Sequence, residues 1–109
     1  MRYKMFATAK LSFQDVTKLP VKYSELSPGE RREVRVAYIK QQNDKCYYCK
    51  GVLTLPAKNY VTDKKIHKSL FPKGFFDHPI HLHHNHDTDM TIGAVHAWCN
   101  AVLWEHEGE

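Results

Sequence analysis

The sequence predicts a small α+β domain in which a metal ion ties a strand–turn–strand–helix unit, over residues 80–107, to the segment that follows the first helix. Three observations support this fold class. The chain of 109 residues has room for one domain, and residues 80–95 show the pattern of two short strands. Three cysteines and eight histidines indicate metal ligands, since an odd number of cysteines argues against a disulfide framework. A chain this short also gains from a bound metal ion, because its core alone is small.

The chain is expected to form a single domain over residues 1–109. Residues 1–45 would supply support, with a short strand or two in residues 1–23 followed by a helix. Residues 46–107 would form the core. A basic and irregular insertion, residues 52–79, would interrupt that core.

The first helix is predicted from Ser27 to about Gln42. Ser27 and Glu30 have the spacing of a capping box, and Pro28 suits the first helical position. Val34, Ala37 and Tyr38 fall on one face, which therefore would be buried.

The second half of the core is predicted from alternation and turn residues. A strand is expected from Ile80 to His86, a turn over 87–89, and a returning strand over 90–95. A helix would then run from about His96 to Glu107 and end at glycine 108.

The composition is that of a soluble globular protein. Apolar residues make up 42% and charged residues 26% of the chain, with a formal charge of +4 and a pI of about 9.0. This balance argues against disorder and permits binding to an anionic polymer. No signal peptide follows Met1, and no apolar run approaches the ~18 residues of a membrane span. We therefore expect no membrane partner and a location in the cytoplasm of a bacterium or phage-infected host cell.

Four side chains in two pairs have the spacing of a structural zinc site. Cys46 and Cys49 form a C-x-x-C pair on a tight turn closed by Gly51. His96 and Cys99 stand three residues apart at the start of the predicted helix, where side chains at this spacing face the same way. This Cys₃His set uses every cysteine. The alternative is that the cysteines are buried core residues without a metal.

Residues 83–100 place histidines on a strand and Asn100 on the following helix, next to Cys99. This arrangement resembles the ββα-metal nucleases, also called His-Me finger or HNH endonucleases, and is most similar to the recombination endonuclease VII group. The likeness covers residues 46–49 and 83–100. The residues shared with the motif of that group in the second segment are His84, His86, Thr88, Gly93, Cys99 and Asn100.

The resemblance implies a role for each matching residue. His84 would be the general base that takes a proton from the attacking water. Asn100 and His83 would hold a catalytic divalent ion, and His86 would contact the scissile phosphate or assist at the ion. His96 stands where the group has a zinc-binding cysteine. The residue types suit this chemistry, because a neutral imidazole is an effective base near neutral pH and an amide carbonyl suits a hard cation.

Two departures from the group's motif affect the ion and the turn. His83 replaces an acidic ligand, which should weaken Mg²⁺ and favour Mn²⁺, Ni²⁺ or another ion that accepts imidazole. The catalytic ion is thus expected to be Mg²⁺ or Mn²⁺, with Ni²⁺ also allowed. A carboxylate of Asp87 or Asp89 is an alternative ligand. Asp89 also stands where the motif has glycine, a change expected to alter the turn.

Two groups of basic residues are candidates for contacts with phosphates, which would make binding salt-dependent. The alternative for each group is a solvated charged surface. His78 and His81 lie outside the motif and are expected to be structural or to face DNA, whereas His67 and His106 are expected at the surface. The candidate basic residues are Lys64, Lys65, Lys68 and Lys73 in the insertion and Arg31 and Arg35 in the first helix.

These features together predict a metal-dependent endonuclease that hydrolyses DNA by nicking, double-strand or branched-DNA cleavage, as a monomer or homodimer. RNA is an alternative substrate. A second hypothesis is a zinc-knuckle module that binds nucleic acid without cutting it, or an accessory subunit of a phage DNA-processing machine. The histidine-rich strand would then be a solvent-facing surface or a second metal-binding surface. The pairing of His84 with Asn100 favours the nuclease, because a binding module has no use for both.

Overall fold

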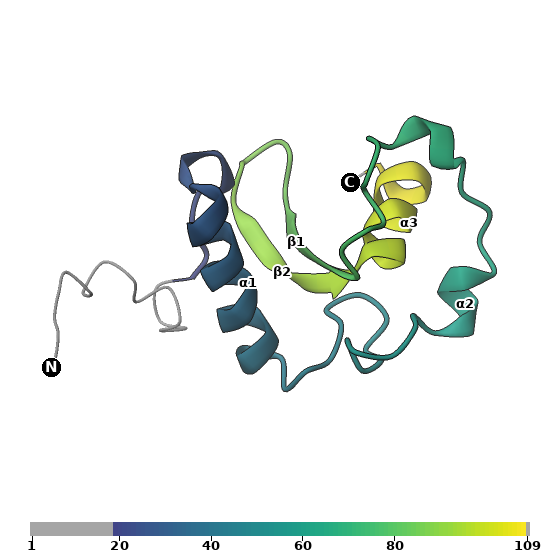
Figure 1. Ribbon diagram of the computed structural model, residues 1–109, viewed down its shortest axis with the longest axis horizontal. Helices are drawn as coiled ribbons and strands as arrows, with labels where there is room; N and C mark the ends of the chain where they lie inside the picture. The colour runs from purple at the N-terminus through teal and green to yellow at the C-terminus, as the bar shows by residue number, and fades with distance from the viewer. Residues whose placement is uncertain (1–18, 109) are drawn as a thin grey trace, which may run out of the picture.

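A β-hairpin that continues directly into a helix is the central feature of the computed structural model, which describes residues 19–108 (Figure 1). Strand β1 (Ile80–His84) pairs antiparallel with β2 (Thr91–His96), and Ile80 lies opposite His96. Helix α3 (Ala97–Glu107) begins at the next residue and ends at Gly108, which has the left-handed conformation. The predicted order of strand, turn, strand and helix is confirmed, and the fold is a small mixed α/β fold with a two-stranded sheet.

The first strand ends at His84, two residues earlier than the sequence predicts. Asn85 causes this, because its side-chain oxygen accepts the N–H groups of Asp87 and Thr88 at 2.8 and 2.9 Å and so starts the turn. His86 therefore lies in the turn and not on the strand. The register also shifts between His83 and His84.

The turn keeps a left-handed position although Asp89 replaces the expected glycine. Asp89 has a φ of 66°, a conformation that glycine adopts freely and aspartate tolerates better than most residues. Its carboxylate accepts hydrogen bonds from the backbone N–H and the hydroxyl of Ser24. These bonds lower the pKa of Asp89. The carboxylate thus ties the turn to the segment before the first helix.

Helix α1 (Pro28–Gln41) begins with the predicted capping box, in which the Ser27 hydroxyl and the Glu30 side chain each accept the other residue's backbone N–H. The helix buries Val34, Ala37 and Tyr38, as predicted, and Tyr38 forms a hydrogen bond with Thr91 of β2. Helices α1 and α3 lie on opposite sides of the hairpin (Figure 1).

The end of α1 is fastened to the middle of β2 by Gln42. The Gln42 amide accepts the N–H of Ala94 at 2.9 Å and donates to the Ala94 carbonyl at 3.0 Å. Gly93 makes this approach possible, since a Cβ there would lie 2.7 Å from the Gln42 oxygen and 3.1 Å from Tyr47. The close packing of Gln42 and Tyr47 therefore favours glycine at position 93.

The segment 52–79 is irregular, as predicted, apart from the short helix α2 (Asn59–Thr62) and a 3-10 turn over Lys68–Leu70. Two exposed histidines bond the middle of this segment to α3. His67 pairs with Glu105 at 2.6 Å, and His106 donates to the Lys65 carbonyl at 2.6 Å. Across residues 19–108, no helix has the length and apolar character needed to cross a lipid bilayer.

The strands predicted within residues 1–23 fall mostly outside the described residues. Within residues 19–23, a single β-bridge joins Lys22 to Met90, and Val21 accepts the N–H of Thr91 at 2.9 Å. Residues 19–23 therefore pair with the residues at the start of β2 through one antiparallel bridge.

Candidate functional site

The four predicted zinc ligands meet in one buried cluster. One ligand atom from each of Cys46, Cys49, His96 and Cys99 lies within 4.8 Å of the others, and each residue is 4% exposed or less. Within residues 19–108, no other group of three or more His, Cys, Asp or Glu side chains gathers in this way. The cysteines are free thiols, so no disulfide competes with a metal.

The His96 ring is oriented for metal binding by its backbone partners. Its Nε2–H donates to the carbonyls of Val52 and Leu55 at 3.0 and 2.8 Å. The proton is therefore on Nε2, and the lone pair of Nδ1 faces the Cys49 and Cys99 sulfurs at 3.5 and 3.6 Å. A carbonyl that fixes the far nitrogen in this way is typical of a metal-binding histidine.

The thiols lie where backbone N–H groups stabilise sulfur anions. The Cys46 sulfur accepts from Tyr48 and Cys49, and the Cys49 sulfur accepts from Gly51, at 3.4 to 3.5 Å. A hydrogen bond with Cys99, assisted by the backbone N–H groups of Cys49, His96 and Tyr48, lowers the pKa of Cys46 to about 4, and the same bond and burial raise the pKa of Cys99. A Zn²⁺ ion bound to the sulfurs would displace the thiol protons. The cluster fits a structural zinc ion with four protein ligands.

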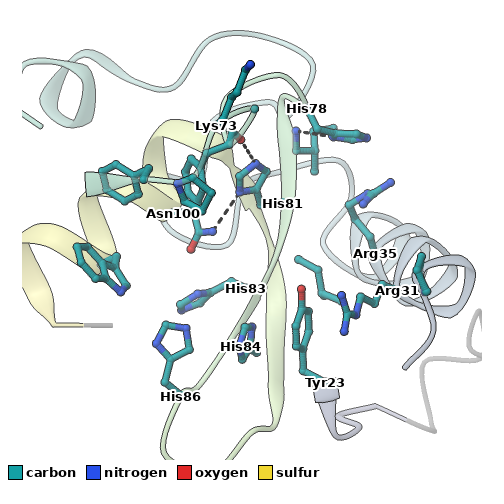
Figure 2. Close-up of a pocket in the computed structure, with 18 of the residues that line it drawn as sticks. Tyr23, Arg31, Arg35, Lys73, His78, His81, His83, His84, His86 and Asn100 are labelled. Atoms are coloured by element: carbon teal, nitrogen blue, oxygen red, sulfur yellow. Dashed lines mark hydrogen bonds between the residues drawn. The ribbon is translucent and has the colours of Figure 1, made fainter. Parts of the chain in front are cut away.

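A cavity of about 690 Å³, which none of the four cluster residues lines, is bordered by α1, the loop around residues 70–75, β1 and α3 (Figure 2). Two neighbouring residues of α3 face the two different sites, because consecutive side chains on a helix point about 100° apart. Cys99 is fully buried in the cluster, whereas Asn100 lines the cavity. The two side chains therefore face different sites.

The three histidines of the motif line this cavity from the end of β1 and the turn (Figure 2). His83 is 3% exposed. His84 stacks on Tyr23, and the His86 ring lies 4.7 Å from that of His84 in an edge-on arrangement. Burial, followed by the nearby His86 and His83, lowers the pKa of His84 and so favours its neutral form.

His81 contacts the proposed metal ligand Asn100, a contact that the sequence-based interpretation missed. The Asn100 side-chain nitrogen lies 3.1 Å from His81 Nδ1, and His81 Nε2 lies 2.8 Å from the Phe75 carbonyl. Burial lowers the pKa of His81. The alternation of side chains along a strand could have indicated this contact, because it places His81 on the same side of β1 as His83.

The basic residues predicted to contact nucleic acid divide into two sets. Arg31 and Arg35 from α1 and Lys73 from the 70–75 loop line the cavity. Lys64, Lys65 and Lys68 do not, and the Lys68 ammonium lies over the rings of Phe76 and Trp98.

None of the described residues that line the cavity is acidic. The alternative ligands Asp87 and Asp89 do not reach it, and the Asp89 carboxylate is bonded to Ser24 instead. The cavity therefore presents imidazole nitrogens and the Asn100 amide, together with the basic side chains of Arg31, Arg35 and Lys73.

Comparisons of the chain with protein-family models, with curated proteins and with solved structures found no match.

Proposed function

We propose that this protein is a metal-dependent endonuclease of the HNH class that hydrolyses DNA phosphodiester bonds. In this proposal the β1–β2 hairpin and α3 are the ββα-metal unit. The observation that carries it is the placement of His84 and Asn100 in one cavity with Arg31, Arg35 and Lys73, apart from the Cys₃His cluster, which has its own four ligands. A zinc module that only binds has no need of this second, separately lined site.

His84 is the proposed general base. Its stacking on Tyr23 and partial burial hold the ring at the cavity and favour the neutral form, which is the form that accepts a proton from water. His86 lies edge-on to His84 in the exposed turn, where it can donate a hydrogen bond to a phosphate oxygen.

His83 and Asn100 are the proposed ligands of the catalytic ion. They offer an imidazole nitrogen and an amide oxygen to the same cavity, a donor set that fits Mn²⁺ or Ni²⁺ better than Mg²⁺. When bound, such an ion stabilises the charge that develops on the phosphate and the leaving oxygen. Because no acidic residue lines the described cavity, the phosphodiester would supply the negative charge near the ion.

Arg31, Arg35 and Lys73 are the proposed phosphate contacts. They approach the cavity from two sides, α1 and the 70–75 loop, so that a nucleic-acid backbone crossing the cavity would pass between them. We assign no described element to the reading of base edges, so the proposed recognition is of the nucleic-acid backbone and not of its base sequence. DNA is the proposed substrate, with RNA as the comparison in the test.

Cleavage of supercoiled plasmid tests this function. The wild type is incubated with Mg²⁺, Mn²⁺ or Ni²⁺ beside His84→Ala, and His67→Ala serves as a matched control because His67 is an exposed histidine paired with Glu105. The wild type and the control should cut, and His84→Ala should be slower by about 10²- to 10⁴-fold, the usual loss of a general base. Excess EDTA should abolish cleavage.

Equal cleavage by the wild type and His84→Ala would contradict the assignment of the base. Binding of DNA without cleavage under any ion would instead favour the zinc module that binds nucleic acid. A parallel assay with single-stranded RNA and branched DNA would identify the preferred substrate form.

A further inference from the structure

A chain of two hydrogen bonds runs from the backbone at Phe75 to the amide of Asn100 (Figure 2). The Phe75 carbonyl lies 2.8 Å from Nε2 of His81, and Nδ1 of His81 lies 3.1 Å from the side-chain nitrogen of Asn100. The three groups come from three separate parts of the fold: the loop before β1, β1 itself and α3.

The first bond determines the direction of the second. A carbonyl oxygen only accepts, so Nε2 of His81 carries the ring proton. In the neutral imidazole Nδ1 is then an acceptor, and only the NH₂ group of Asn100 can pair with it. The alternative amide orientation would place two acceptors against each other.

This orientation directs the Asn100 oxygen into the cavity, toward the side where His83 and His86 lie (Figure 2). That oxygen is the atom a cation would bind, whereas the NH₂ group would repel it. The amide of an unrestrained asparagine would present either end to the cavity.

The His81 ring is itself held in place. Phe75 packs edge-on against it, with ring centroids 4.6 Å apart, and the strand pairing of His81 with Val95 fixes its backbone. The ring is therefore a fixed support and Asn100 is the group it supports.

We infer that His81 is a positioning residue that holds the Asn100 amide with its oxygen toward the ion site. This inference rests on the proposed function and adds a residue to it: the ion site would depend on a histidine that is not a ligand. Residues that orient metal ligands in this way typically contribute about 10- to 100-fold in metal affinity.

The test is Mn²⁺ binding to the zinc-loaded protein, measured by electron paramagnetic resonance. His81→Leu removes the acceptor and should weaken Mn²⁺ binding by about 10- to 100-fold. His81→Asn places an amide oxygen near the former Nδ1 and should restore most of the affinity. His78→Leu is the matched control, since the His78 ring lines the same cavity but bonds to the Ile80 N–H. Zinc content and the thermal unfolding midpoint identify any variant that fails to fold.

A second readout does not require an ion. Long-range ¹H–¹⁵N spectra of His81 should show the proton on Nε2, and the Asn100 side-chain amide signals should change in His81→Leu but not in His78→Leu. A proton on Nδ1, or unchanged Asn100 signals in His81→Leu, would overturn the inference. Equal Mn²⁺ affinity of the wild type and His81→Leu would overturn it as well and would leave the nuclease proposal standing.

Failure of the proposed function gives a different pattern. The wild type would then bind no Mn²⁺ at this cavity and cut no DNA, while the His81 and Asn100 signals would still report the hydrogen bond. That pattern removes the ion site and with it the role inferred for His81.

Discussion

The phenol ring of Tyr23 lies flat against the imidazole of His84, with ring centroids 3.8 Å apart and planes 5° apart. The Arg31 guanidinium lies 4.4 Å from the centroid of the same Tyr23 ring, and Figure 2 shows Tyr23 between the two side chains. The proposed base is therefore packed against an aromatic residue from the segment before α1. A hydrogen bond from the Tyr23 N–H to the Asp89 carbonyl at 2.8 Å holds this segment to the turn.

Loss of the Tyr23 ring should impair cleavage through the orientation of His84. Tyr23→Ala is expected to lower kcat about fivefold, since stacked pairs contribute about 1 kcal/mol beyond burial. Tyr23→Phe keeps the ring and should retain the wild-type kcat. Single-turnover cleavage rates would measure both. A Tyr23→Ala variant that folds and cuts at the wild-type rate would show that the stack has no role.

Arginine and lysine residues at the cavity should contribute to DNA affinity more than those elsewhere. Arg35→Ala and Lys73→Ala are each expected to weaken binding and to reduce the slope of log affinity against log salt by about one. Lys64→Ala and Lys65→Ala are the controls, because neither residue lines the cavity. Equal losses in both sets would place the DNA on another surface. Fluorescence anisotropy at several salt concentrations measures the slopes.

The preference among divalent ions should follow the side chain at position 83. The wild type, with an imidazole and no acidic residue at the described cavity, is expected to cut faster with Mn²⁺ or Ni²⁺ than with Mg²⁺. His83→Asp supplies a hard anionic ligand and should shift the preference toward Mg²⁺. Cleavage rates across the three ions give the ratio. An unchanged ratio in His83→Asp would remove His83 from the ion site.

Removal of zinc should unfold the protein. Structural Zn²⁺ sites contribute on the order of 10 kcal/mol, which is comparable to the whole stability of a small domain. Elemental analysis should find about one zinc per chain, since its four ligands fill a tetrahedral site. After chelation, circular dichroism should show loss of structure that Zn²⁺ restores and Mg²⁺ does not. A metal-free protein that stays folded would contradict this role.

Gly93→Ala should destabilise the junction of α1, β2 and the Cys46–Cys49 turn. The added Cβ would meet the Gln42 oxygen at 2.7 Å, and overpacking of this kind costs about 1 to 3 kcal/mol. Gly29→Ala is the matched control, because a Cβ there has open space at the start of α1. Urea unfolding should therefore show a loss of stability for Gly93→Ala and none for Gly29→Ala.

Local sequence patterns predicted those helices and strands whose ends are set by interactions between residues a few positions apart. Ser27, Pro28 and Glu30 specify the start of α1 because the capping bonds span three positions. The early end of β1 could also have been read locally, since an asparagine at position 85 favours a side-chain turn with the next residues.

The zinc cluster was predictable for a different reason. Thiol and imidazole pairs have few other uses at this spacing, so the residue types themselves indicate which segments meet. Helix geometry also explains why Cys99 and Asn100 face different sites, because neighbouring residues on a helix point about 100° apart.

The sequence by itself thus determined the four residues of the buried Cys₃His cluster, the hairpin, and helices α1 and α3. These features depend on short spacings or on residue types suited to one common ion. The tertiary structure alone decided that Tyr23 packs on His84, that His81 holds Asn100, and that Arg35 and Lys73 share a cavity which Lys64 does not reach. These contacts join residues that are distant in the chain, and many side chains could satisfy them equally well. No local spacing encodes them, because they arise only when the packing of α1 and the 70–75 loop around the hairpin is complete.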